Sequence, residues 1–182
     1  MVNTDSSQAR TVTAASDHGL LDVKSLVLLA ILLAAGFILN MTVGNALAMT
    51  GIKPQFIIAA YALAILLTRA NLAQSALYAL LSACVIQVTT SIPGLNFLTE
   101  LVAALAMSAL VSAGVGGEAL NPFVATLVTT LVSGALFAVV GTVLAGLTPA
   151  ALVKVPLVLG TAAFNAVVVQ ALYFPLGKVL GK

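Results

Sequence analysis

The chain has 182 residues, of which 62% are hydrophobic and only 7% are charged, and its formal net charge is +2. Soluble domains carry about 25% charged residues, and a water-soluble protein of this size has no interior large enough to hide so much apolar surface. We therefore expect an integral membrane protein, and the small net charge without a basic, aromatic-interleaved run argues against nucleic-acid binding.

The N-terminal residues 1–23 are polar, rich in Ser and Thr, and without hydrophobic periodicity. They are expected to form a flexible cytoplasmic tail or a short surface helix. The apolar run starts only after Lys24 and continues past residue 40, which is typical of a retained transmembrane helix and not of a secretory signal peptide. Residues 24–182 are therefore expected to form one membrane domain.

Six apolar stretches follow, most of them close to the length of about 20 residues that a spanning helix needs. Charges and Pro, Gly and Asn residues divide them at approximately 25–47, 54–69, 72–90, 98–115, 122–146 and 155–177. The alternation in segments of about ten residues that marks a β-barrel is not seen. The predicted fold is an all-α integral membrane protein, a compact bundle of six transmembrane helices with short connections.

Lysine and arginine predict the orientation of this bundle. If the N-terminus lies inside, the inner segments hold Arg10, Lys24, Arg69, Lys178 and Lys182. The outer turns then hold only Lys53 and Lys154. Positive charge favours the cytoplasmic side, so we expect a multi-pass protein with both chain ends inside.

The sequence contains no pattern typical of an enzyme. His18, the only histidine, lies in the N-terminal tail, and no GxxxxGK[ST] motif is present, so neither a histidine-based triad nor ATP hydrolysis at a P-loop is expected. A mid-membrane acidic pair for a proton pump and a TVGYG-like channel filter are also missing. These absences favour a transporter component that takes its energy from another chain.

Polar residues collect near the predicted outer ends of the helices, together with Asn165 and Gln170 in the sixth span. Such side chains need partners in hydrocarbon, so hydrogen bonding between helices is one interpretation. Their common depth favours another, a polar-rimmed pocket open to the outside. The residues expected to contact a ligand are Asn45, Lys53, Gln87, Thr90, Asn96 and Asn165.

The stretch MTGIKPQF (49–56) places Lys53 on the predicted outer side, against the positive-inside trend. One interpretation is an interfacial anchor whose ammonium group reaches the water. The other is a ligand-facing cation at a mouth that Lys53 shares with the 89–97 turn. Pro54 is expected to begin the second helix, where a missing N–H costs nothing, and Gly51 gives the turn its conformational freedom.

The first span contains Ala30-Ile-Leu-Leu-Ala34, a spacing of small residues that lets helix backbones approach closely. Together with six short-looped helices and the N-in, C-in orientation, it resembles the S components of energy-coupling factor (ECF) transporters over residues 25–182. These are membrane-embedded subunits that bind vitamins and other micronutrients. The resemblance implies ligand binding at the outer face. It also implies docking through Ala30 and Ala34 on a transmembrane scaffold protein that carries two ATPases, and inward delivery by toppling.

The stretch GIKPQFIIAAYALAILL, followed by TTSIPG, is similar to tryptophan-type S components, whose pattern is close to GxKPD…ILL…TTxxPxGQxPNxxDK. The matching residues are Gly51, Lys53, Pro54, Thr89, Thr90 and Pro93. The aspartate after Lys-Pro is Gln55 here, and NFLTEL replaces PNxxDK. Glu100 is the acid that remains to hold an amino acid's ammonium group.

A bulkier ligand is the competing interpretation. Only 5% of the residues are aromatic, so the chain has few rings on which a flat vitamin would stack. Small side chains and short outer turns suit a corrinoid, and we expect cobalamin as the transported ligand, with no permanently bound cofactor. The alternatives are tryptophan or another small vitamin and, from a different class, a stand-alone channel or secondary carrier.

Cys84, the only cysteine, rules out an intrachain disulfide. Its predicted depth in the third span makes its thiolate a remote candidate for a cobalt ligand. The plainer interpretation is a small buried hydrophobic residue.

Overall fold

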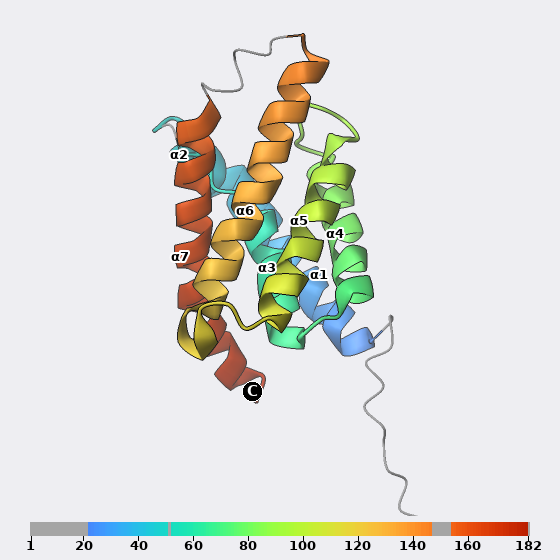
Figure 1. Ribbon diagram of the computed structural model, residues 1–182, viewed down its shortest axis with the longest axis vertical. Coiled ribbons are helices and arrows are strands. Elements are labelled where there is room, and N and C mark those ends of the chain that lie inside the picture. Colours follow the sequence, from blue (N-terminus) through green and yellow to red (C-terminus); the bar gives the residue numbers. More distant parts are fainter. Residues whose placement is uncertain (1–21, 51, 147–153, 182) are drawn as a thin grey trace, which may run out of the picture.

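The structure is a computed structural model that describes residues 22–50, 52–146 and 154–181. All regular elements in these ranges are helices (Figure 1). Their bounds are α1 (Val23–Leu39), the π-helix η1 (Asn40–Gly44), α2 (Asn45–Ala48), α3 (Phe56–Thr68), α4 (Leu72–Ile86), α5 (Leu95–Ser112), α6 (Gly117–Leu144) and α7 (Val155–Val179). Residues 1–21 of the predicted N-terminal tail and Gly51 lie outside the described residues, and the tail's last residue, Val23, belongs to α1 instead.

Four helices are long and apolar enough to cross a membrane, which indicates a membrane protein. The first, Val23–Ala48, comprises α1, η1 and α2 in one continuous segment, and the others are α5, α6 and α7. The all-helical prediction is confirmed for the described residues. The sequence predicts six spanning helices, and α3 and α4, with 13 and 15 residues, fall short of that length.

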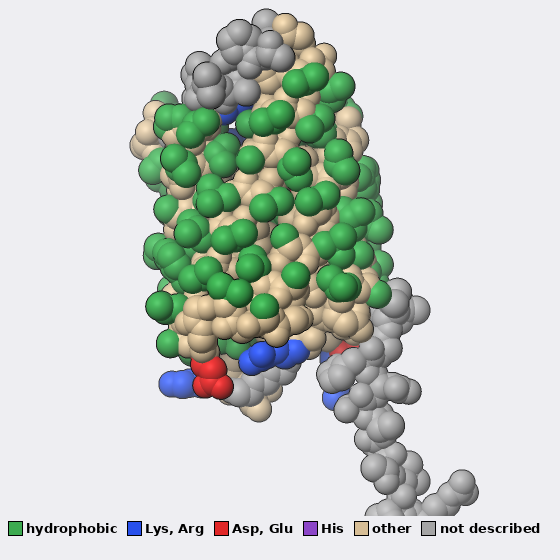
Figure 2. Space-filling model, in the orientation of Figure 1, with side chains coloured by type: hydrophobic (Ala, Val, Ile, Leu, Met, Phe, Trp, Pro, Cys, Tyr) green, Lys and Arg blue, Asp and Glu red, His purple; other side chains and the backbone are tan. Residues whose placement is uncertain are grey.

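The helices run back and forth between two ends of the bundle. In Figure 1, α1 begins and α7 ends at the lower end, whereas α2, the 87–94 connection and the start of α7 lie at the upper end. Hydrophobic side chains cover the side of the bundle that Figure 2 shows, and charged side chains gather at its lower end. Most of the charged side chains visible on this face therefore lie at one end.

Helix α3 forms the centre of the bundle (Figure 1). All of its residues, FIIAAYALAILLT, are buried, and it contacts α1, α4, α5, α6 and α7. A helix that is apolar on all sides is typical of such a position. Because protein surrounds α3, its length does not have to match a bilayer. It begins at Phe56, so Pro54 precedes the helix and does not start it, contrary to the sequence prediction.

Helix α6 turns a polar stripe toward the interior. Thr126, Thr129, Thr130 and Ser133 are all buried, at spacings of three and four residues that place them on one helix face. Hydroxyl groups need partners that hydrocarbon does not offer, so this face packs inward. The sequence predicts that this helix starts at 122, but α6 begins at Gly117 and contains Pro122.

Gly36 marks a close approach between α1 and α3. A Cβ at this position would lie 2.8 Å from the carbonyl oxygen of Phe56 and 3.3 Å from the Cβ of Ala60. Backbone atoms cannot rotate aside, so Gly36→Ala must separate the two helices. Overpacking costs about 1–3 kcal/mol, and we expect the melting temperature in detergent to fall by roughly 2–12 °C.

Gly160→Ala is the matched control for this change, because the nearest atom to its added Cβ would be Ile52 Cγ1 at an ordinary 3.5 Å. Its melting temperature is expected to stay close to that of the wild type. An unchanged melting temperature for Gly36→Ala would contradict the tight packing of α1 against α3.

Candidate ligand-binding site

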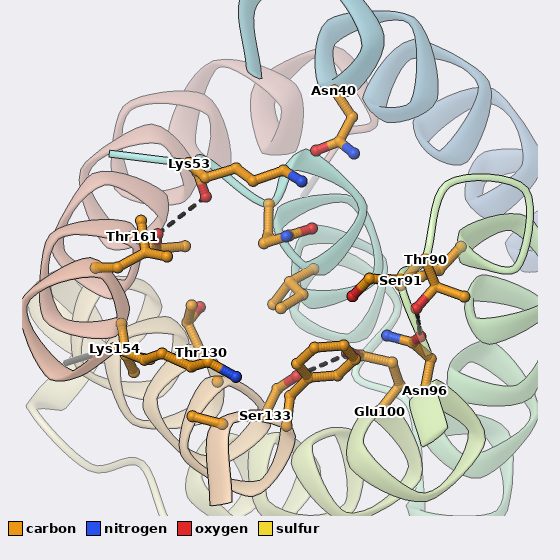
Figure 3. Close-up of a pocket in the computed structure, with 18 of the residues that line it drawn as sticks. Asn40, Lys53, Thr90, Ser91, Asn96, Glu100, Thr130, Ser133, Lys154 and Thr161 are labelled. Atoms are coloured by element: carbon orange, nitrogen blue, oxygen red, sulfur yellow. Dashed lines mark hydrogen bonds between the residues drawn. The ribbon is translucent and has the colours of Figure 1, made fainter. Parts of the chain in front are cut away.

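A cavity of about 300 Å³ lies at the upper end of the bundle (Figure 3). Its polar lining residues are Asn40, Lys53, Gln55, Thr89, Thr90, Ser91, Asn96, Glu100, Thr130, Ser133, Lys154 and Thr161. Its apolar wall is formed by Ile58, Ile86, Gly134, Phe137, Ala138, Leu157 and Val158. A mostly apolar wall with a few placed polar groups is typical of a small-molecule site.

Glu100 joins three helices at this cavity and is only 2% exposed. The hydroxyl of Tyr61 on α3 donates to its Oε2 at 2.9 Å, and the hydroxyl of Ser133 on α6 donates to its Oε1 at 2.7 Å. Thr99, its neighbour on α5, donates to Oε1 at 3.4 Å. A carboxyl group within a helical membrane bundle is a candidate functional group.

Lys53 and Lys154 project into the cavity from different parts of its wall (Figure 3). The ammonium group of Lys154 donates to Thr142 Oγ1 at 3.2 Å. Within the ranges that the structure describes, neither lysine forms an ion pair with a carboxylate. Two cations that face one cavity repel each other, and an anionic ligand group between them would be attracted to both.

The segment that carries Lys53 is fastened to α7. Asn165 donates from Nδ2 to the carbonyl oxygen of Gln55 at 3.1 Å and accepts from its backbone N–H at 3.3 Å. Thr161 donates to the carbonyl oxygen of Lys53 at 2.9 Å. Asn165 is fully buried and does not line the cavity. It therefore positions the cavity wall and is not placed to touch a ligand directly.

Three of the six predicted ligand contacts, Lys53, Thr90 and Asn96, line this one cavity. The hydroxyl of Thr90 donates to Oδ1 of Asn96 at 2.5 Å, which ties the 87–94 connection to the start of α5 (Figure 3). Predicted polar residues that are far apart in the sequence thus meet at the upper end.

Besides Asn165, two further predicted contacts do not line the cavity. The side chain of Gln87 stabilises its own turn, because Oε1 accepts from the N–H of Gly94 at 2.9 Å and Nε2 donates to the carbonyl oxygen of Ala83 at 3.3 Å. Asn45 is exposed, and its Nδ2 donates to the carbonyl oxygen of Met41 at 3.0 Å. Both side chains are partnered locally within their own helix or turn.

Three further residues singled out in the sequence, Ala30, Ala34 and Cys84, lie on the outside of the bundle. Ala30 and Ala34 are exposed on α1, where the rest of the described chain leaves them uncovered. Cys84 is exposed on α4 and does not line the cavity. Its interpretation as a buried hydrophobic residue is wrong, and its position gives no support to a role as cobalt ligand.

Asn40 is a cavity residue that the predicted contacts omit. It begins the π-helix η1, and π turns inside α-helices are frequent at functional sites. Its side chain is 6% exposed, and its Oδ1 has no hydrogen-bond partner among the described residues. A buried acceptor without a partner lowers stability. Because Asn40 lines the cavity, this unpartnered oxygen favours a role for Asn40 in ligand binding (Figure 3).

A scan against protein-family models and searches of curated proteins and of solved structures found no match for this chain. The fold and the site therefore define only the general class of protein to which this chain belongs. It is an all-helical chain, within the described ranges, with four helices able to cross a membrane and a charged, partly apolar cavity at one end.

Proposed function

We propose that this chain is the substrate-binding membrane subunit, or S component, of an ECF-type importer. The observation that supports this is the upper cavity, which combines two lysines, a buried carboxylate and an apolar wall. In this proposal six helices cross a prokaryotic plasma membrane and the cavity faces outward. Lys24, Arg69 and Lys178 then lie on the inner side, as positive residues usually do.

The cavity favours a small ligand that carries both an acidic and a basic group. Its volume of about 300 Å³ is at the lower end of the range of about 300–1,000 Å³ for drug-sized ligands, and a corrinoid is larger than these. Lys53 and Lys154 offer partners for a carboxylate, and Glu100 offers one for an ammonium group. Phe137 offers a ring face for an aromatic side chain. We therefore place tryptophan ahead of cobalamin, which reverses the order favoured by the sequence alone.

A melting experiment on the purified chain in detergent tests this proposal. A ligand that binds only the folded state stabilises it by about 2.7 kcal/mol at 100 times its Kd. L-tryptophan is expected to raise the melting temperature, and cobalamin is expected to leave it unchanged. A shift with cobalamin alone would contradict the small-ligand proposal. A shift with neither compound would contradict both substrate assignments.

The exposed face of α1 with Ala30 and Ala34 is the proposed docking surface for the scaffold protein. Leucine on a lipid-exposed face has little effect on folding, but it keeps a partner helix from approaching closely. Ala30→Leu and Ala34→Leu are each expected to lower ATP-dependent uptake by the reconstituted complex roughly 5- to 30-fold. The ligand-induced melting shift of the isolated chain should be unchanged.

Cys84→Leu provides the control for these docking variants, because it adds similar bulk to an exposed position on a different helix, α4. Its uptake is expected to equal that of the wild type. Wild-type uptake in both alanine variants would contradict the assignment of the docking surface.

A further inference from the structure

A second cavity, of about 560 Å³, lies at the lower end of the bundle. It is bounded by the end of α3, the start of α6 and the last turns of α7. Arg69 and Lys178 are its cations, and Glu118 is its acid. The aromatic rings of Tyr173 and Phe174, packed edge to face at 5.2 Å, form part of its wall. This cavity shares no residue with the upper one.

Arg69 holds a backbone conformation that is unfavourable for its residue type. It ends α3 with φ 51° and ψ 44°, and it is the only non-glycine residue with positive φ in the described part of the chain. Glycine is the usual residue at such a helix end, because it has no Cβ to clash in the left-handed region. Strained positions are concentrated at functional sites. A long cation at this position therefore points to a role that glycine would not fulfil.

The lower cavity leaves these cations free to meet a ligand. Gly114 and Gly117 both line it, and a Cβ on either would meet no atom within 4 Å. Within residues 22–50, 52–146 and 154–181, neither Arg69 nor Lys178 forms an ion pair or a side-chain hydrogen bond. Glu118 lines the same space without pairing with either of them. The site thus offers two unengaged cations beside an aromatic wall.

We propose that the lower cavity binds the head group of an anionic phospholipid, independently of any ligand in the upper cavity. Arg69 and Lys178 contact the phosphate, for which the planar guanidinium fork of arginine is well suited. An acyl chain then follows the ring of Phe174, which is 44% exposed. The charged lower end next to the hydrophobic surface in Figure 2 corresponds to head-group depth. Basic pockets between membrane helices bind such head groups.

Native mass spectrometry tests this proposal. The full chain is released from micelles that contain equal amounts of phosphatidylglycerol and phosphatidylcholine, and the lipid that stays bound is identified. The wild type is expected to retain phosphatidylglycerol preferentially. Arg69→Gln and Lys178→Gln should each lower that preference roughly fivefold, the contribution of one cation near an anionic lipid. Lys24→Gln is the control, because Lys24 is exposed at the start of α1, at the same end, and does not line the cavity.

Two further variants separate lipid binding from folding. Arg69→Gly relieves the backbone strain, so in phosphatidylcholine this variant should melt at a higher temperature than the wild type. The same variant should lose the preference for phosphatidylglycerol. Glu118→Gln removes the acid from the cavity and should increase the preference. The proposal is overturned if the wild type shows no preference, if Lys24→Gln loses as much as Arg69→Gln, or if inorganic phosphate alone stabilises the chain as strongly as phosphatidylglycerol does.

Discussion

Replacing Glu100 with alanine is expected to destabilise the bundle more than any other change at the upper cavity. The substitution leaves the hydroxyls of Tyr61 and Ser133 without their acceptor, and these residues are only 0% and 3% exposed. Each stranded buried donor costs about 1–3 kcal/mol. The two together correspond to a fall in melting temperature of roughly 4–24 °C.

A double variant tests whether the stranded donors cause this loss. Tyr61→Phe removes one donor, so in the Glu100→Ala background it should restore part of the melting temperature, although the same change alone in the wild type lowers it. Additive losses in the double variant would show that the hydrogen bond between Tyr61 and Glu100 does not stabilise the bundle.

Glu100→Gln separates the charge of this side chain from its structural role, because glutamine keeps the volume and one acceptor oxygen. The variant is expected to fold and to lose affinity for tryptophan. A hydrogen bond to a charged group contributes about 1.5–3 kcal/mol, which corresponds to roughly a 10- to 150-fold increase in Kd. Titration calorimetry measures this change, and a wild-type Kd would contradict contact between Glu100 and the ligand.

Neutralising the two cavity lysines is expected to produce the second large effect. Lys53→Gln and Lys154→Gln should each raise the Kd for tryptophan about tenfold or more, because each ammonium group faces the space proposed for the ligand carboxylate. Folding should change little, since neither lysine forms an ion pair within the described ranges and the one side-chain hydrogen bond, from Lys154 to Thr142, can also be made by glutamine. The melting temperatures of the ligand-free variants check this second expectation.

Two ligand analogues show which group the lysines recognise. Tryptamine lacks the carboxylate and is a cation, so its weaker binding should not be weakened further by Lys53→Gln and Lys154→Gln, which remove like charges from the cavity. Indole-3-propionate lacks the ammonium group, so its binding should be weakened by the lysine variants but not by Glu100→Gln. If the lysine variants weakened tryptophan and tryptamine binding by the same factor, the effect would be a distortion of the cavity and the proposed recognition would be wrong.

The class of fold was predictable because hydrocarbon leaves few ways to satisfy a backbone. The helix ends were less predictable, because local side-chain contacts set them. Helix α4 ends at Ile86, before the predicted 90, where Gln87 bonds to the N–H of Gly94. Gly94, with φ 85°, then starts α5 at Leu95, before the predicted 98. Gly94, directly before α5, was the sequence signal from which the start of this helix could have been predicted.

The end of the bundle at which a polar residue lies was predictable from the sequence, but the direction in which its side chain points was not. Asn45 lies near the predicted end of the bundle but faces outward, directly after η1. A π turn shifts the helix faces that follow it, and no motif in the sequence marks this one. By contrast, the spacing of Thr126, Thr129, Thr130 and Ser133 marks the inward face of α6. Applying helical periodicity to polar residues would have identified Ser133 as a partner for the cavity.

That Lys53 and Lys154 face the same cavity could be seen only in the tertiary structure. Lys53 precedes α3, and Lys154 is the N-cap residue of α7, about 100 positions later. Their common cavity depends on the hydrogen bonds from Asn165 and Thr161 that fasten the segment before α3 to α7. No local pattern in the sequence indicates that these two segments lie side by side.

Binding without transport separates the proposed subunit from a channel or a secondary carrier. The most direct measurement is the uptake of radiolabelled tryptophan by proteoliposomes that contain this chain alone. We expect saturable binding at about one tryptophan per chain, lost in Glu100→Gln, with no accumulation in the vesicle lumen over time. Accumulation that increases with internal volume, in the absence of a scaffold protein, ATPases and ATP, would contradict the proposed function.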